Sequence, residues 1–199
     1  MRSIFVVSIL VLSSAAFAQP AFWSGDTTGQ ATWDRPLSFT GISSLGPVHF
    51  EIQPFWVTVG SEYVFEVNGT GHPDTYIHVY EGTFNPLDQL VNLIAGDDDF
   101  SDTFTVLSGT GQGFASSRIA LGEGSNYGGA GTGLNLTAGS QYFAIVSGFG
   151  AGDFGPYDAG IGGGQGQVNL GIVPEPATLT VLGLGALALL RRRRRKTSA

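Results

Sequence analysis

Residues 48–67 read VHFEIQPFWVTVGSEYVFEV, two apolar-rich runs on either side of the pair Gly60-Ser61. In the second run, Tyr63, Phe65 and Val67 fall on one face of an extended chain, and Glu62, Val64 and Glu66 fall on the other. Alternation with a period of two indicates β-strands. Pro54 lacks an amide hydrogen and marks a bulge or an edge position in the first run. This stretch therefore predicts two consecutive strands.

Similar short runs recur on both sides of this stretch, and turn-forming residues separate them. They lie at residues 37–42, 75–80, 90–95, 104–107, 117–121, 141–147 and 167–172. Twenty of the 31 glycines lie between Gly109 and Gly171, and glycine costs about 1 kcal/mol per helical position relative to alanine. No part of residues 19–173 has a helical period. The pattern predicts an all-β fold, an antiparallel sandwich or barrel of about eight to nine strands.

The first 18 residues have the three parts of a secretory signal peptide. Arg2 gives the positive start, Ile4–Leu12 the apolar region, and Ala16-Phe17-Ala18 the small-x-small cleavage site. The predicted cut separates Ala18 from Gln19. A permanent membrane anchor is disfavoured because the apolar region is short. The sequence therefore predicts export of residues 19–173 as one domain.

The last 26 residues, 174–199, again combine three unlike pieces. Pro174-Glu175-Pro176 is followed by an apolar run over residues 177–190 and a basic block over residues 191–196. As a helix the run would be about 21 Å long, short for a hydrocarbon core of about 30 Å, although flanking arginines can snorkel. The basic block would stay on the cytoplasmic side. A core helix or a nucleic-acid-binding tail explains the order of the pieces less well.

This tail resembles the PEP-CTERM sorting signal of bacterial envelope proteins, in which an exosortase recognises Pro174, Glu175 and Pro176. The resemblance implies export by the Sec machinery, a transient inner-membrane anchor through a transmembrane helix, and a location in the cell envelope or outside a Gram-negative-type bacterium. The resemblance predicts where the protein is sent; the activity of the exported part depends on residues 19–173.

Charge and cysteine content narrow the possible partners of the exported part. It has only Arg35 and Arg118 against fifteen acidic residues. Such a surface repels nucleic acid and anionic lipid, so no nucleic-acid partner is expected. The chain has no cysteine, although the exported location permits disulfides. Stability must therefore come from packing, from backbone pairing and from a bound ion if there is one.

Residues 62–149 resemble the bacterial pre-peptidase C-terminal domain, a jelly-roll-like β-sandwich. The resemblance rests on three motifs: a D-x-Y-x-x-x-Y strand at residues 74–80, an acidic turn at 97–98, and an A-G-x-x-Y-x-x-x-V-x-G strand at 138–148. The glycine-rich insertion at residues 122–133 and an additional strand near the tail depart from the pattern. The resemblance implies a non-catalytic module, some relatives of which bind calcium structurally.

Asp97, Asp98 and Asp99 form the densest group of carboxylates, and Asp102 follows closely. Calcium takes about six to eight oxygen ligands, and adjacent acids in a turn can supply several of them. The sequence thus predicts a candidate calcium site. The other interpretation is a solvated turn whose side chains cap backbone amides.

Two further clusters carry weaker hypotheses. His72, Asp74 and His78 would form a zinc site only if the chain folded back at Pro73; otherwise these histidines are packing residues. Six aromatic residues could stack on sugar rings, although bulky aromatics in a sandwich are mostly core. They are Trp23, Trp33, Phe55, Trp56, Tyr76 and Tyr80.

The sequence contains no recognisable catalytic constellation. It has no cysteine and no serine in a G-x-S-x-G turn, and the G-x-G-x-x-G match at residues 150–155 precedes Pro156 and more glycine, which predicts a loop. We therefore expect a non-catalytic structural or adhesive protein of the envelope or extracellular matrix. The alternative is a module that binds extracellular polysaccharide, assisted by calcium.

Overall fold

The structure is a computed structural model that describes residues 18–122 and 133–174. All of the regular elements in these residues are β-strands, and the described part contains no helix that is both long and apolar enough to cross a membrane. The all-β prediction is confirmed. Residues 1–17 of the predicted signal peptide, which ends at Ala18, and the predicted C-terminal hydrophobic helix lie outside the described residues.

Short and long strands follow one another along the described residues. In chain order they are β1 (Ala21–Asp26), β2 (Thr32–Trp33), β3 (Pro36–Ser38), β4 (Gly41–Ile42), β5 (Val48–Val57), β6 (Ser61–Gly69), β7 (Thr75–Glu81), β8 (Leu93–Asp97), β9 (Ser116–Ile119), β10 (Leu134–Leu136), β11 (Tyr142–Gly148), β12 (Pro156–Gly162) and β13 (Val168–Leu170).

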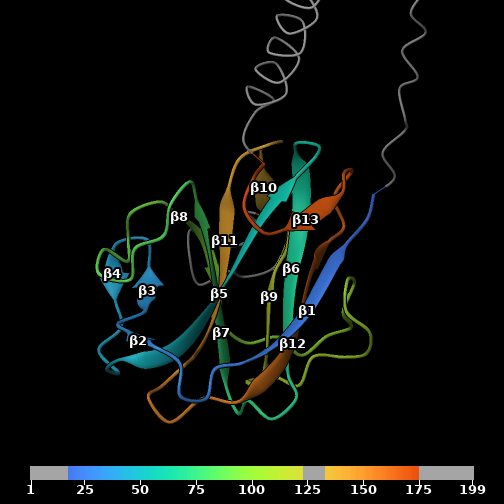
Figure 1. Cartoon of the computed structure of the whole chain (residues 1–199). Helices are drawn as coiled ribbons and strands as arrows, with labels where there is room; N and C mark the ends of the chain where they lie inside the picture. Colours follow the sequence, from blue (N-terminus) through green and yellow to red (C-terminus); the bar gives the residue numbers. More distant parts are fainter. Residues whose placement is uncertain (1–17, 123–132, 175–199) are drawn as a thin grey trace, which may run out of the picture.

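Two antiparallel sheets form the two layers of the described part of the chain (Figure 1). The first has the order β1-β12-β6-β10, and β9 pairs with β6 on the same side as β10. The second has the order β13-β5-β11-β7-β8, and β2 pairs with the start of β5. Strands β3 and β4 form a separate small hairpin. The pairings within these sheets are antiparallel, as the sequence predicts.

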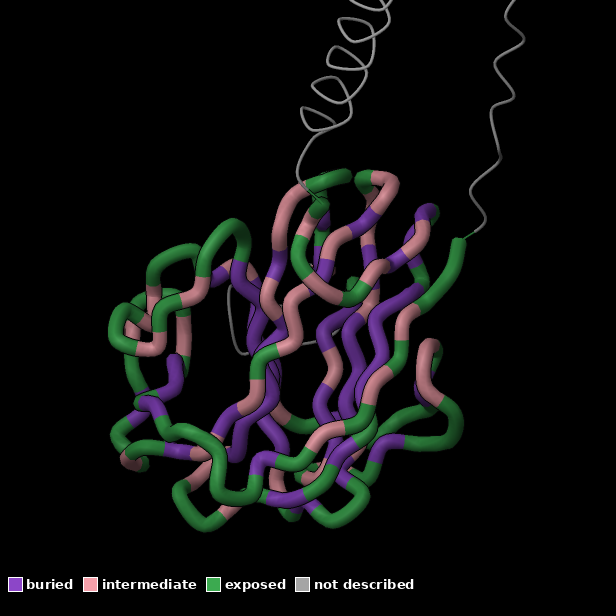
Figure 2. The backbone as a smooth tube through the Cα atoms, in the orientation of Figure 1, coloured by how far each residue is buried: buried purple, intermediate pink, exposed green. Residues whose placement is uncertain are grey.

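The main core fills the space between the two sheets, where buried backbone concentrates in Figure 2. Phe65 and Val67 of β6 face it from the first sheet, and Ile77 and Val79 of β7 face it from the second. All four side chains are fully buried. Burying a side chain of this size contributes about 1.5–3 kcal/mol, which explains why the alternating pattern fixes the register.

The opposite face of the second sheet is also buried, in a second cluster. Tyr76 and Tyr80, which alternate with Ile77 and Val79 along β7, pack there with Trp33 and Phe50. The segment that contains β2 and the loop that carries Phe84 cover them. The sequence correctly separates the two faces of β7, and the structure shows that both are apolar because both are covered.

The predicted number of eight to nine strands is too low. Strand β12 lies in the glycine-rich region that sequence patterns assign to loops, whereas residues 104–107 form no strand. Gly160 and Gly162 explain the first error, because a Cβ at either position would press against Val106. These glycines let the 104–107 segment lie against one face of β12. Tyr157, Ala159 and Ile161 still alternate along the face toward the core, but the glycines between them make the stretch look like a loop.

Glu66 holds that segment in place. Its fully buried carboxylate accepts hydrogen bonds from the amides of Thr105 (2.7 Å), Val106 (2.8 Å) and Leu107 (2.7 Å). The hydroxyl of Thr105 donates a further bond, and Nε of Arg118 lies 3.1 Å from Oε1. A segment without strand partners is thus fixed by a single side chain that satisfies several of its backbone donors.

Both ends of the described chain lie at the same end of the sandwich (Figure 1). Gln19 forms a parallel bridge with Gln167, and its carbonyl accepts the amide of Val168 at 3.0 Å. At the other terminus, the amide of Val173 donates to Oε1 of Gln141 at 2.7 Å. The strands and both core clusters fall between these two points, so the part predicted to be exported contains its own core.

Candidate functional site

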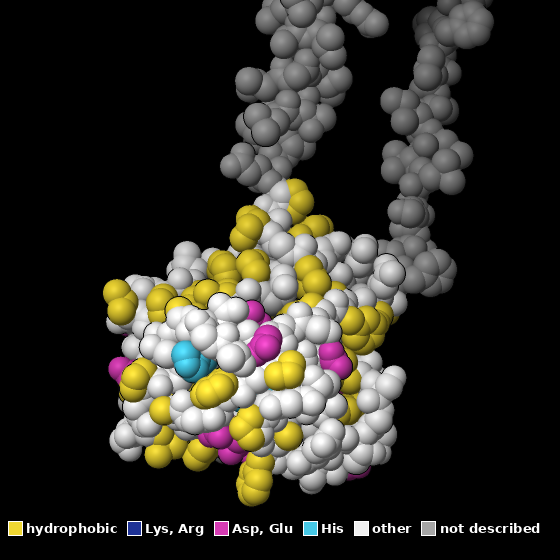
Figure 3. All heavy atoms as spheres, turned by 60° about the horizontal axis from the view of Figure 1, so that its bottom comes forward, with side chains coloured by type: hydrophobic (Ala, Val, Ile, Leu, Met, Phe, Trp, Pro, Cys, Tyr) yellow, Lys and Arg dark blue, Asp and Glu magenta, His cyan; other side chains and the backbone are white. Residues whose placement is uncertain are grey.

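Three carboxylates gather at the end of the sandwich away from the chain termini. Asp74 precedes β7, while Asp98 and Asp99 follow β8. Strands β7 and β8 pair antiparallel, with Ile77 opposite Asp97, so the start of one lies beside the end of the other. One carboxylate oxygen from each residue lies within 4.8 Å of those of the other two. In Figure 3, seen obliquely from this end, the visible surface of the described residues carries Asp and Glu but no Lys or Arg.

Crowding and burial disfavour negative charge in this cluster. Burial raises the pKa of Asp98 to about 7, and the charges of Asp99 and Asp74 raise it too. Burial likewise raises the pKa of Asp74 to about 6, with contributions from Asp153 and Asp99. Oδ1 of Asp74 and Oδ1 of Asp98 are buried and accept no hydrogen bond from the described residues. A bound proton or a bound cation would neutralise the carboxylate charges and would also give the two unpartnered oxygens a partner.

Arg35 is the positive charge that acts on these groups, and it lowers the pKa of both Asp74 and Asp98. The side chain is fully buried and donates to the carbonyls of Phe149 (3.0 Å) and Pro36 (3.2 Å). Its guanidinium lies 3.9 Å from the centre of the Tyr76 ring.

The structure assigns different positions to the three predicted calcium ligands. Asp98 and Asp99 are in the cluster, whereas Asp97 is 4% exposed and its Oδ2 accepts the amide of Arg118 at 3.2 Å. Asp97 alternates with Ala95 along β8 and lies opposite Ile77, as Ala95 lies opposite Val79, so strand alternation turns its side chain toward the main core. Asp74 is the third member of the cluster in place of Asp97. The pairing of β7 with β8 brings it there, and the local sequence does not reveal that pairing.

The histidines of the zinc hypothesis are not part of this cluster among the described residues. His78 is fully buried and stacks on Tyr76, with ring centres 5.0 Å apart. His72 is 1% exposed, and neither of its ring nitrogens has a hydrogen-bond partner in the described part of the chain. Burial lowers the pKa of His72 to about 4 and that of His78 to about 3. Both are therefore neutral packing residues at neutral pH.

Most of the six candidate stacking aromatics are core residues. Trp33, Phe55, Tyr76 and Tyr80 are at most 3% exposed. Trp23 on β1 and Trp56 on β5 are half-buried, and they belong to different sheets. The six residues therefore do not form one continuous platform, and only these two can present part of a ring to a ligand.

The comparisons with known proteins concern the tail. Residues 173–195 match the family model described as the PEP-CTERM protein-sorting motif. The motif begins immediately after the folded part, at the residue whose amide Gln141 binds. No curated protein matches the chain. The fold and this motif together define the class: an all-β protein with a signal for exosortase processing, exported and associated with the cell envelope.

Proposed function

We propose that the exported part acts without catalysis as a structural or adhesive protein of the cell envelope or extracellular matrix, after an exosortase has removed its tail. The observation that carries this proposal is the PEP-CTERM motif at residues 173–195, directly behind a folded part that has its own strands and core. The tail would anchor the chain transiently in the inner membrane of a Gram-negative-type bacterium. A jelly-roll topology related to pre-peptidase C-terminal domains is part of the same proposal.

The place where the folded part ends supports processing close to the membrane. Three residues separate Val173, whose amide donates to Gln141, from Ala177, where the apolar run begins. From Val173 to Ala177 an extended chain spans about 14 Å at most. The end of the sandwich that carries both termini would thus face the membrane during processing, and the acidic cluster would face away.

Tail removal is the direct test of this proposal. Mass spectrometry of the mature protein from its host should find a C-terminus between Pro174 and Ala177, without the basic block. Glu175→Ala should leave the tail attached, because the motif is what the enzyme recognises. Ser198→Ala, beyond the basic block, is the matched control and should be processed normally. An intact tail in the mature wild-type protein would count against exosortase sorting.

We further propose that calcium binds the carboxylates of Asp74, Asp98 and Asp99. Three carboxylates supply three oxygens, and water and backbone oxygens would complete a shell of about six to eight. The two buried oxygens without hydrogen-bond donors support this assignment. The ion would join the start of β7 to the end of β8 in a domain that has no disulfide.

Calcium should therefore stabilise the exported protein after chelator treatment. A ligand at a hundredfold excess over Kd contributes about 2.7 kcal/mol, which corresponds to a rise in Tm of about 5–10 °C for a domain of this size. The rise should be larger at pH 8 than at pH 5, because Asp74 and Asp98 must lose their protons to bind. Thermal unfolding followed by circular dichroism measures it.

Two variants make the calcium experiment specific. Asp98→Asn should abolish the calcium-dependent rise in Tm, and Asp102→Asn should keep it, because Asp102 is an exposed residue that caps the amide of Thr103 instead. If the wild type shows no rise at pH 8, or if Asp98→Asn shows the same rise, the cluster is a solvated turn.

A further inference from the structure

A groove lies where strand β5 lacks a neighbour on one edge. Along the other edge β5 pairs with β11 from Phe50 to Phe55. On this edge β2 pairs only with residues 48–49 and β13 only with residues 55–57. No described strand pairs with this edge at residues 51–53.

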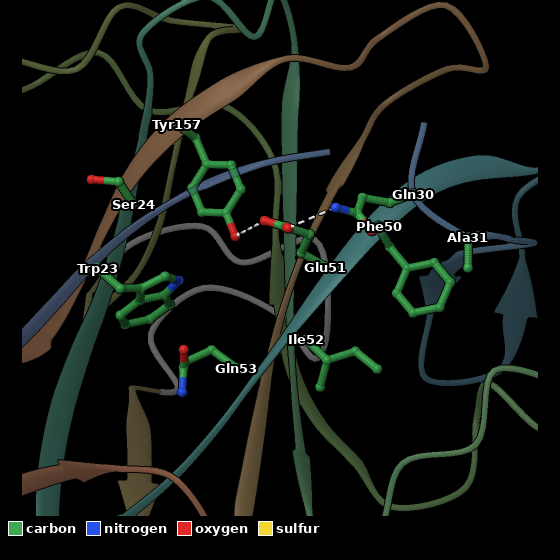
Figure 4. A pocket seen from close by; sticks show the side chains of 9 residues that line it. All are labelled: Trp23, Ser24, Gln30, Ala31, Phe50, Glu51, Ile52, Gln53 and Tyr157. Carbon is green, nitrogen blue, oxygen red and sulfur yellow. Dashed lines mark hydrogen bonds between the residues drawn. The ribbon is translucent and has the colours of Figure 1, made fainter. Parts of the chain in front are cut away.

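The groove above this gap has a volume of about 410 Å³, and β1 and β12 of the first sheet form its other wall (Figure 4). Ligand pockets commonly measure about 300–1,000 Å³.

Glu51 is held in a fixed orientation in this groove. Its Oε2 accepts the hydroxyl of Tyr157 at 2.9 Å and the amide of Asp26 at 3.0 Å, and its Oε1 accepts the side-chain amide of Gln30 at 3.1 Å. Burial and the adjacent Glu51 raise the pKa of Tyr157, so the phenol remains a donor. A carboxylate has about four acceptor positions, so one remains for a ligand.

Gly25 allows this arrangement to form. It lies on β1 opposite Tyr157, and a Cβ at this position would collide with both the Glu51 carboxylate and the Tyr157 hydroxyl. The absence of a side chain on β1 lets groups from β5 and β12 meet beneath it. The polar part of the groove is therefore formed by three strands and is in place before any ligand binds.

Next to this polar part lies an aromatic surface. Trp23 is half-buried, and its indole stacks on Phe65 with ring centres 5.7 Å apart and an interplanar angle of 23°. Gln53 donates its side-chain amide to the carbonyl of Pro54, which leaves its Oε1 as an acceptor. Figure 4 shows Trp23 and Gln53 close together on one side of the groove, with Glu51 further along.

We propose that this groove binds a neutral sugar residue of an extracellular polysaccharide. The apolar C–H face of the ring would lie against Trp23, and Glu51 and Gln53 would accept hydrogen bonds from its hydroxyls. An acidic sugar is disfavoured because Glu51 faces the ligand and the domain carries a large excess of negative charge. Only the extracellular source of the sugar rests on the proposed export; the binding itself does not.

Isothermal titration of the exported protein with neutral hexasaccharides of glucose, mannose, galactose and xylose tests this proposal, with an alginate hexasaccharide as the acidic comparison. At least one neutral oligosaccharide should bind saturably, and alginate should not. Trp23→Ala and Glu51→Gln should each weaken binding about tenfold or more, as expected for the loss of a stacking surface or of a hydrogen bond to a charged group.

Trp56→Ala is the matched control, because Trp56 is a second half-buried tryptophan, pairs with β13 and does not line the groove. It should bind like the wild type. Trp23→Ala also removes a contact with Phe65, so Gln53→Ala serves as a second variant whose fold is checked by circular dichroism. Gln53→Ala should also weaken binding. If none of the four neutral oligosaccharides binds, or if Trp23→Ala and Gln53→Ala both bind like the wild type, the proposal is overturned. Tail cleavage in the host is measured separately and does not depend on this result.

Discussion

Replacing Glu66 by alanine is expected to lower the free energy of unfolding by about 3–5 kcal/mol, a loss typical of a broken buried ion pair. The side chain is fully buried, and its removal leaves the amides of residues 105–107 without their acceptor and Arg118 without its partner. Whole domains are stable by only about 5–15 kcal/mol, so much of the stability would be lost. Urea unfolding of the exported protein, followed by tryptophan fluorescence, measures the change.

Two variants separate the ion pair from the backbone anchor. Glu62→Ala, four residues earlier on the same strand and half-buried, should change stability by less than about 0.5 kcal/mol. The double variant Glu66→Leu/Arg118→Leu removes both charges, yet it still leaves three amides without an acceptor and should remain destabilised. If it regains the wild-type stability, the amides contribute nothing and the interpretation of Glu66 as an anchor for the segment is wrong.

The sequence predicts the central strands well because their environment is similar along their length. Strands β5, β6, β7 and β11 lie inside the sheets, and their alternating side chains report burial on one or both faces. Strand β12 is equally central, and Tyr157, Ala159 and Ile161 alternate along its inner face, but glycines occupy its outer face where the segment that Glu66 anchors covers it. Its glycines are an adaptation to that contact, which depends on residues far away in the sequence.

The candidate sites show the same limit. The acidic run at residues 97–99 is visible in the sequence, but strand alternation turns Asp97 into the protein and strand pairing brings Asp74 in. The groove has no local signature, since Trp23, Glu51 and Tyr157 come from three strands that are far apart in the chain. Spacing along a sequence can identify residues that are adjacent in a turn; residues that meet across two sheets require the topology.

The buried histidines and the carboxyl groups whose pKa is raised should have opposite effects on stability as the pH falls. The folded-state pKa of His72 and of His78 lies below the unfolded value, so the unfolded state binds protons first and these residues destabilise the fold as the pH falls from about 6.5 to about 4. The folded-state pKa of Asp74 and of Asp98 is raised, so the folded state binds protons first and stability increases over a similar range. In the wild type the two effects partly cancel.

Single substitutions should therefore tilt the pH profile in opposite directions. Between about pH 7 and about pH 4.5, His72→Leu should gain about 2–3 kcal/mol relative to the wild-type change, because the group that protonates in the unfolded state is gone. Asp98→Asn should lose about 1–2 kcal/mol over the same interval, a smaller value because partial exposure screens its charge. Urea unfolding in chelator at several pH values gives both differences. Each variant serves as the control for the other, and profiles parallel to that of the wild type in both would show that neither group changes its proton affinity on folding.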